Sequence, residues 1–208
     1  MSNRPGLRDR KKEMTRQAIS NVATRLFVER GFENVSVADI ADEADVARKT
    51  VFNYFPRKED LVFDREDEVR ALAREALATR GDQPPVRAFQ ALMRRLLDSD
   101  HPLFRMSDRP VQFWRTVRES PALTTRAREL QVSLSDDLAV LLASAAGRPA
   151  SDAQGRLAAA MLMAGLVTAY AEALRVFRER QDPGPAFTAV MERSFTGVDA
   201  ALAGTPYV

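Results

Sequence analysis

Residues 36 to 61 have the layout of two short helices joined by a tight turn, and they constrain the fold more than any other stretch. Ser36 can cap the first helix, and Asp39 stands three residues on, where its carboxylate completes a capping box. Asp45 lies at the sharp turn, where the backbone is expected to be left-handed. Pro56 ends the second helix, because the residue before a proline is disfavoured in helical geometry. This layout predicts a helix-turn-helix, whose second helix is built to lie in a DNA major groove.

The second helix divides its residues between two faces. The residues predicted to face the protein are Val46, Thr50, Val51 and Tyr54. Those predicted to face outward are Arg48, Lys49, Phe52 and Asn53. A merely solvated face has no need of a large exposed aromatic, whereas an aromatic beside two cations suits contact with a thymine methyl or a sugar.

The stretch resembles the DNA-binding domain of TetR-type bacterial transcriptional regulators. Their pattern is a Thr or Ser cap, then Ile-Ala-x-x-Ala-Gly-Val-Ser, then a short helix ending in Tyr-x-Tyr-Phe before Lys-Glu-x-Leu. The matching residues here are Ser36, Ile40, Ala41, Ala44, Val46, Thr50, Phe52, Tyr54, Phe55, Lys58, Glu59 and Leu61. Two positions depart from the pattern, because Asp45 replaces the turn Gly and Ala47 replaces a Ser that often caps the second helix.

Carried over position by position, the resemblance implies DNA contacts at Ser36, Arg48, Lys49, Thr50, Phe52, Asn53, Tyr54 and Lys58. By their chemistry, Arg48 and Lys49 can donate to guanine O6 and N7, and Asn53 can contact a base edge or a phosphate. The residues expected to bind phosphates and fix the register are Ser36, Tyr54 and Lys58.

Almost every other segment has helical periodicity, and no strand pattern is found. Further helices are predicted near residues 8–30, 58–80, 85–98, 110–119, 121–146, 151–181 and 185–203, with Ser151 capping the longest apolar one. The expected fold is all-α, with about nine helices in two domains. Residues 1–57 would form a three-helix DNA-binding head with a basic N-terminal arm, and residues 58–208 a helical regulatory and dimerisation body.

Composition excludes several kinds of site. The 208 residues include no cysteine and one histidine, His101, so disulfides, thiolate metal sites and His-rich metal sites are ruled out. No Gly-rich phosphate loop or nucleophile motif is found, so we expect no enzyme, metal or cofactor. No apolar run approaches the roughly 20 residues of a membrane span, and the basic start is not that of a signal peptide. We therefore expect a cytoplasmic protein with no membrane partner.

Charge is divided unevenly along the chain. The net charge is +2, but residues 1–58 carry +4 and the rest −2, and all four lysines lie in the first part. A basic end on a neutral body is typical of a DNA-binding domain. A solvated charged surface alone would give the same counts, and the helix-turn-helix favours the DNA interpretation.

Residues 151–175 are rich in alanine, with Ala164 and Gly165 near the middle. Small residues allow close helix packing, so this segment and the last helix are predicted to form a dimer interface. A dimer reads two DNA half-sites about one helical turn apart, which a single helix-turn-helix cannot do. The alternative is an ordinary buried core helix.

A second prediction for the body concerns a small-molecule site. Aromatic and apolar residues gather on the middle helices, and such residues line ligand pockets as well as cores. By residue count an ordinary core is the better interpretation, whereas the resemblance to a ligand-gated family implies a pocket lined by Phe89, Met93, Phe113, Trp114 and Val117.

Together these features predict a ligand-responsive transcriptional regulator. We expect a repressor that binds a palindromic DNA operator as a homodimer and is released by a small-molecule effector. Two other classes of protein fit the sequence less well. An enzyme lacks its motifs here, and a sequence-independent architectural DNA protein would not require so large an apolar body.

Overall fold

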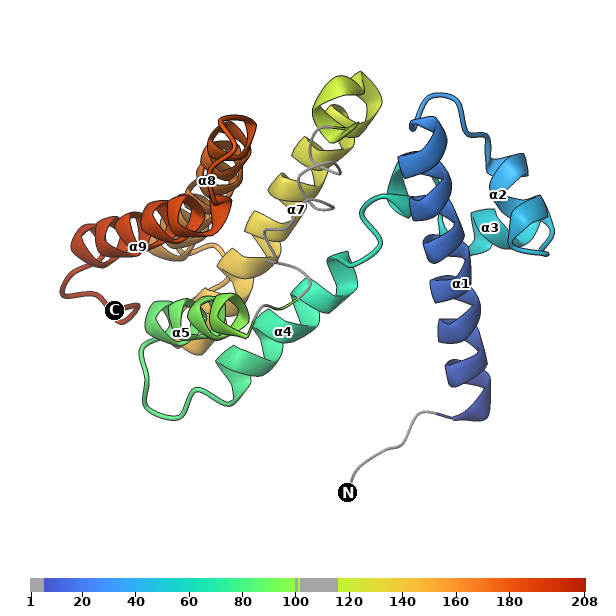
Figure 1. Ribbon diagram of the computed structural model, residues 1–208. Helices are drawn as coiled ribbons and strands as arrows, with labels where there is room; N and C mark the ends of the chain where they lie inside the picture. The colour runs from blue at the N-terminus through green and yellow to red at the C-terminus, as the bar shows by residue number, and fades with distance from the viewer. Residues whose placement is uncertain (1–5, 100, 102–115) are drawn as a thin grey trace. The chain divides into compact units, whose positions relative to one another are not determined.

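The computed structural model describes residues 6–99, 101 and 116–208, without the side chains of Leu7 and Asp9. Within those ranges every regular element is a helix, which confirms the predicted all-α class (Figure 1). The chain divides into two compact units. Unit 1 comprises Met1–Asp64 and Thr116–Ala127, and unit 2 comprises Arg65–Arg115 and Arg128–Val208. The domain boundary predicted after residue 57 falls inside unit 1.

Unit 1 is built on one long helix and a pair of short ones. Its elements are α1 (Leu7–Arg30), α2 (Val37–Glu43), α3 (Arg48–Tyr54) and the 3-10 helix η1 (Lys58–Leu61). Helix α2 packs on α1 and α3, and η1 packs on α1 (Figure 1). The fully buried side chains at their centre include Ile19, Leu26, Ile40 and Val51. Each such side chain contributes roughly 1.5–3 kcal/mol of burial free energy, so this cluster fixes the angles between the three helices.

The helix predicted over residues 58–80 is wrong in one respect, because it is interrupted. The chain leaves η1 after Leu61 and begins helix α4 (Glu66–Ala78) only after a turn. Asp64 explains the interruption: its carboxylate accepts from the Ser20 hydroxyl and its backbone carbonyl accepts from Arg16, both on α1. These bonds hold Asp64 against α1, and α4 begins anew with acidic residues in its first turn.

Unit 2 contains α4, α5 (Pro85–Asp98), the part of α7 (Pro121–Ala145) from residue 128 on, α8 (Ala153–Arg178) and α9 (Pro183–Ala201). Helices α8 and α9 lie side by side, and α5 packs on both α4 and α9 (Figure 1). The cap of α8 is Asp152, which accepts from the backbone N–H groups of Gln154 and Gly155, so the prediction of Ser151 was one residue early.

The chain end is fastened to the same unit. Tyr207 is fully buried, and its carbonyl accepts from the backbone N–H of Val86 at the start of α5. Its hydroxyl donates to the Asp152 carboxylate at 3.1 Å. The tail therefore ties the start of α5 to the start of α8.

Small residues on α8 serve packing within the chain. Ala158, Ala159, Ala169 and Ala173 are buried in the core of unit 2. Gly165 meets Ser194 of α9 so closely that an added Cβ would lie 2.1 Å from the Ser194 hydroxyl oxygen. Gly165 is therefore required where α8 and α9 approach each other.

The expectation from the sequence that no apolar segment is long enough for a membrane span is wrong for helix α8. By length and composition alone its 26 residues could cross a membrane, and 39% of its most apolar window is buried in the structure. A core helix of a soluble protein has the same properties, so this feature is weak evidence for a span.

We predict that Gly165→Ala lowers the free energy of unfolding by about 1–3 kcal/mol, because the new methyl group overpacks the contact with Ser194. Gly197→Ala on α9 is the matched control. A Cβ there meets nothing within 4 Å, so relief of helical glycine should stabilise by roughly 0.5–1 kcal/mol. Urea denaturation of both variants measures the difference. Equal effects of the two substitutions would contradict the close α8–α9 approach.

Candidate nucleic-acid interface

The first short helix, α2, is capped as predicted. The Ser36 hydroxyl accepts from the backbone N–H of Asp39 at 3.2 Å, and the Asp39 carboxylate accepts from the backbone N–H of Ser36 at 2.7 Å. The Ser36 hydroxyl also donates to the Asp39 carboxylate at 2.7 Å, and this bond, together with the one from the Ser36 backbone N–H, holds the pKa of Asp39 below its ordinary value. The capping box fixes where α2 begins and directs the Ser36 side chain to an exposed edge.

The turn between α2 and α3 has the expected left-handed residue. Asp45 has a φ of 52°, a conformation that costs a residue other than glycine about 1–2 kcal/mol. The N–H of Val46 donates to the carbonyl of Ala41, and the N–H of Asp45 to that of Asp42, which is the Schellman pattern of a helix end. These bonds fix the angle at which the chain enters α3.

Helix α3 presents the two faces that its sequence predicts. Val51 is buried, and Val46, Thr50 and Tyr54 are half-buried against the unit. Arg48, Lys49 and Asn53 are exposed, and Phe52 keeps 48% of its surface accessible. The predicted outward set therefore shares one solvent-facing surface.

The start of α3 is poorly suited to a helix in water. Ala47 supplies no side-chain cap, as its sequence implied, and the first turn holds no acidic residue. Arg48 and Lys49 instead place two positive charges where the backbone dipole is already positive. This arrangement is unfavourable for an isolated helix and favourable beside the phosphates of DNA.

The side chain of Lys58 contacts residues within unit 1. Its ammonium donates to the carbonyl of Phe32 at 2.6 Å and lies 4.1 Å from the centre of the Phe32 ring. Partial burial penalises the charged form and lowers the pKa of Lys58 from its ordinary value. The predicted phosphate contact of this residue would therefore compete with bonds inside unit 1.

Three of the five residues predicted to line a ligand pocket lie within the described part of the chain. Met93 is buried and Phe89 half-buried, both on α5 of unit 2. Val117 is buried and belongs to unit 1. Phe113 and Trp114 lie outside the described residues. Among the residues that are described, no group of three or more His, Asp or Glu side chains is arranged to hold a metal ion.

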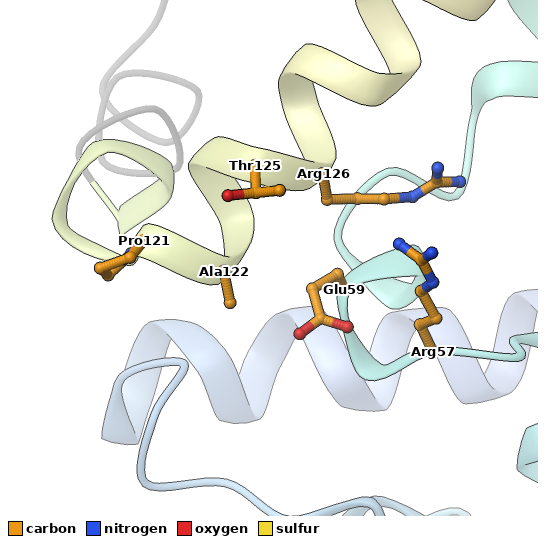
Figure 2. A pocket seen from close by; sticks show the side chains of 6 residues that line it. All are labelled: Arg57, Glu59, Pro121, Ala122, Thr125 and Arg126. Carbon is orange, nitrogen blue, oxygen red and sulfur yellow. The ribbon is translucent and has the colours of Figure 1, made fainter.

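A pocket that the sequence did not predict lies within unit 1. It has a volume of about 460 Å³ and is lined by Arg57, Glu59, Pro121, Ala122, Thr125 and Arg126 (Figure 2). The first two residues flank the start of η1 and the others belong to the first turns of α7. Sequence reasoning had no signal for this contact, because the two segments are more than sixty residues apart.

Comparisons with known proteins agree with this geometry. A family model for bacterial regulatory proteins of the tetR family matches residues 19–64. The HTH-type transcriptional regulator TcmR of Streptomyces glaucescens is 32% identical over 103 residues, which cover 47% of this chain and 46% of TcmR. The match thus spans about half the length of that relative.

Solved structures extend the likeness to most of the chain. NalD, the secondary repressor of the MexAB-OprM multidrug efflux pump in Pseudomonas aeruginosa, has a TM-score of 0.57 and 23% identity over 89% of this chain and 97% of NalD. Thermus thermophilus FadR, a TetR-family repressor crystallised with lauroyl-CoA, has a TM-score of 0.53 and 26% identity over 88% of this chain and 94% of FadR.

Within the described residues, a capped helix-turn-helix and a second, separate helical unit are the architecture of helix-turn-helix regulators. The match to the family model falls on that helix-turn-helix and ends at Asp64, where the first segment of unit 1 also ends. Residues 19–64 therefore carry the helix-turn-helix domain of the tetR family of bacterial regulatory proteins, and the rest of the chain shares the fold of solved members of that family.

Proposed function

We propose that the protein is a cytoplasmic transcriptional regulator that binds duplex DNA through the outward face of α3. The exposed ring of Phe52, flanked by exposed Arg48, Lys49 and Asn53, carries this proposal. Moving an apolar ring out of water lowers the free energy, and so does placing a cation beside phosphates or guanines. A DNA major groove offers both kinds of partner to one short helix.

The side chains of this surface divide by their chemistry. Arg48 and Lys49 would donate to guanine, Asn53 to a base edge, and Phe52 would contact a thymine methyl. The polar groups nearer the body of unit 1 would bind phosphates and set the register, namely Ser36, Thr50, Tyr54 and Lys58.

We predict that Arg48→Ala weakens binding to the preferred duplex by about 1–3 kcal/mol, because a contact to a base is lost. The preferred duplex is first selected from a random library by the wild-type protein, and affinity is then measured by fluorescence anisotropy. Lys58→Ala should weaken preferred and scrambled duplexes alike and lower the salt slope by about one.

Arg74→Ala is the matched control, since Arg74 is also an exposed arginine but belongs to unit 2, outside the proposed DNA-binding unit. It should leave the affinity for both duplexes unchanged. If Arg48→Ala behaves like this control, α3 does not read the bases as proposed.

We further propose that two copies of the chain assemble through α8 and α9. The outer face of α8 carries an exposed, largely apolar row at helical spacing: Leu157, Ala160, Ala164, Val167 and Ala171. A second copy would remove this row from water, and a two-fold interface pairs the same surface of both chains. Two DNA-binding units would then read a palindromic operator.

Replacing Ala164 by arginine should convert the dimer into a monomer, because the exposed row would have to bury a charge. Ala71→Arg, an equivalent change on the exposed side of α4, should leave the dimer intact. Sedimentation velocity at micromolar concentration reports the mass of each variant. A monomeric wild-type protein, or a dimeric Ala164→Arg variant that sediments as the control does, would refute this interface.

We also propose that the protein is a repressor and that a small molecule releases it from its operator. The FadR structure supports this, because that relative is a repressor bound to lauroyl-CoA. NalD adds the likeness of fold to a protein described as a repressor. An effector acts by its higher affinity for the conformer that does not bind DNA.

Trp114 is the only tryptophan of the chain, so fluorescence can test its predicted place in the effector site together with Phe89, Met93, Phe113 and Val117. We predict that a compound that releases the operator changes Trp114 fluorescence, and that Trp114→Ala weakens release while DNA affinity stays near that of wild type. A core role would instead cost about 3–5 kcal/mol of stability. A variant that melts early yet responds normally to the compound would place Trp114 in the core.

A further inference from the structure

We propose that Arg126 is a positioning residue for DNA recognition, which acts through Asp60 on the chain that leaves α3. This proposal rests on the proposed DNA-binding function. It also gives a role to a residue outside the segment 19–64 that defines the family.

The Asp60 carboxylate joins two parts of unit 1 that are distant in the sequence. One oxygen, Oδ2, accepts from the backbone N–H of Arg57 at 2.9 Å, and the other, Oδ1, accepts from Arg126 Nε at 2.8 Å. The side chains of Arg126 and Asp60 are only 20% and 16% exposed. Water competes weakly with a bond so enclosed, so this pair holds its geometry better than a surface ion pair.

The segment around Arg126 is an integral part of unit 1. Ser120 is buried, and its hydroxyl donates to the Glu33 carboxylate at 2.6 Å, in the connection between α1 and α2. Leu123, one turn before Arg126, is fully buried. Residues 116–127 therefore support the helix-turn-helix at two places, the connection before α2 and the connection after α3.

The connection after α3 is short, so its position limits that of the helix. Phe55 is buried directly after α3, Pro56 restricts the backbone, and the N–H of the next residue is the one that Asp60 holds. Figure 2 shows Arg126 extending from α7 to this point, beside Arg57. Groups that recognise a ligand must be held within about 0.5 Å, so a loosened anchor here displaces the outward face of α3.

The alternative role for Arg126 is a direct contact with a phosphate. Its Nε is already bonded to Asp60, in a pocket whose wall also includes the carboxylate of Glu59. The Asp60 carboxylate bonded to this guanidinium competes with a phosphate for it. The two roles differ in a measurable quantity, because losing a phosphate contact lowers the salt slope and losing a positioning contact does not.

The experiment compares full-length wild type, Arg126→Ala, Asp60→Asn and the double variant on the selected duplex and on a scrambled duplex. Affinities are measured over a range of salt, at a temperature where circular dichroism shows each protein fully folded. We expect Arg126→Ala to lose about tenfold in affinity for the selected duplex, with an unchanged salt slope. Affinity for the scrambled duplex should stay within about twofold of wild type.

The double variant distinguishes an action through Asp60 from an independent one. Because both substitutions break the same bond, the double variant should bind no more weakly than the weaker single variant. Asp60→Asn retains an acceptor for the Arg57 N–H, so it provides the test if Arg126→Ala does not fold. The Arg128→Ala variant, at an exposed arginine two residues on, should bind like wild type.

Three results would overturn the proposal: wild-type affinity of either folded single variant, additive losses in the double variant, or a salt slope lowered by about one in Arg126→Ala. A wild-type protein that selects no preferred duplex would instead refute the proposed function, so the two failures are distinguishable.

Discussion

The structure depends on the fact that α3, with seven residues, is too short to be stable by itself. Isolated helices below about 12–15 residues are marginal in water, and this one also lacks a cap and begins with two cations. Its shape is therefore imposed by neighbours: burial of Val51 against the unit and the Schellman turn at Asp45. A helix held in this way can expose the residues that suit DNA even though they do not suit the helix.

The same reasoning gives the first turns of α7 their importance. The segment that matches the family contains the caps, the turn and the buried side chains, but the Asp60 carboxylate has a second partner outside it. Two hydrogen bonds on one carboxylate connect the backbone after α3 to a part of the chain that no helix-turn-helix pattern includes. The DNA-binding unit proposed here is thus assembled from two separate segments.

Local features of this fold were predictable from the sequence, and contacts between distant segments were not. The Ser36 capping box, the left-handed Asp45, the bounds of α5 and the outward face of α3 all follow from neighbouring residues. The interruption before α4 and the closeness of Gly165 to Ser194 depend on partners from other helices. Periodicity indicates that a residue is buried, but it does not identify the side chain that packs against it.

The most direct test of the central claim, that α3 contacts the bases from a preformed unit, is amide hydrogen exchange with and without the selected duplex. Exchange slows where bound DNA restricts opening of the helix. The account predicts slower exchange across Arg48–Tyr54 with the selected duplex than with a scrambled one, together with slow exchange of residues 120–126 even before DNA is added. Unchanged exchange in α3 on binding the selected duplex would contradict it.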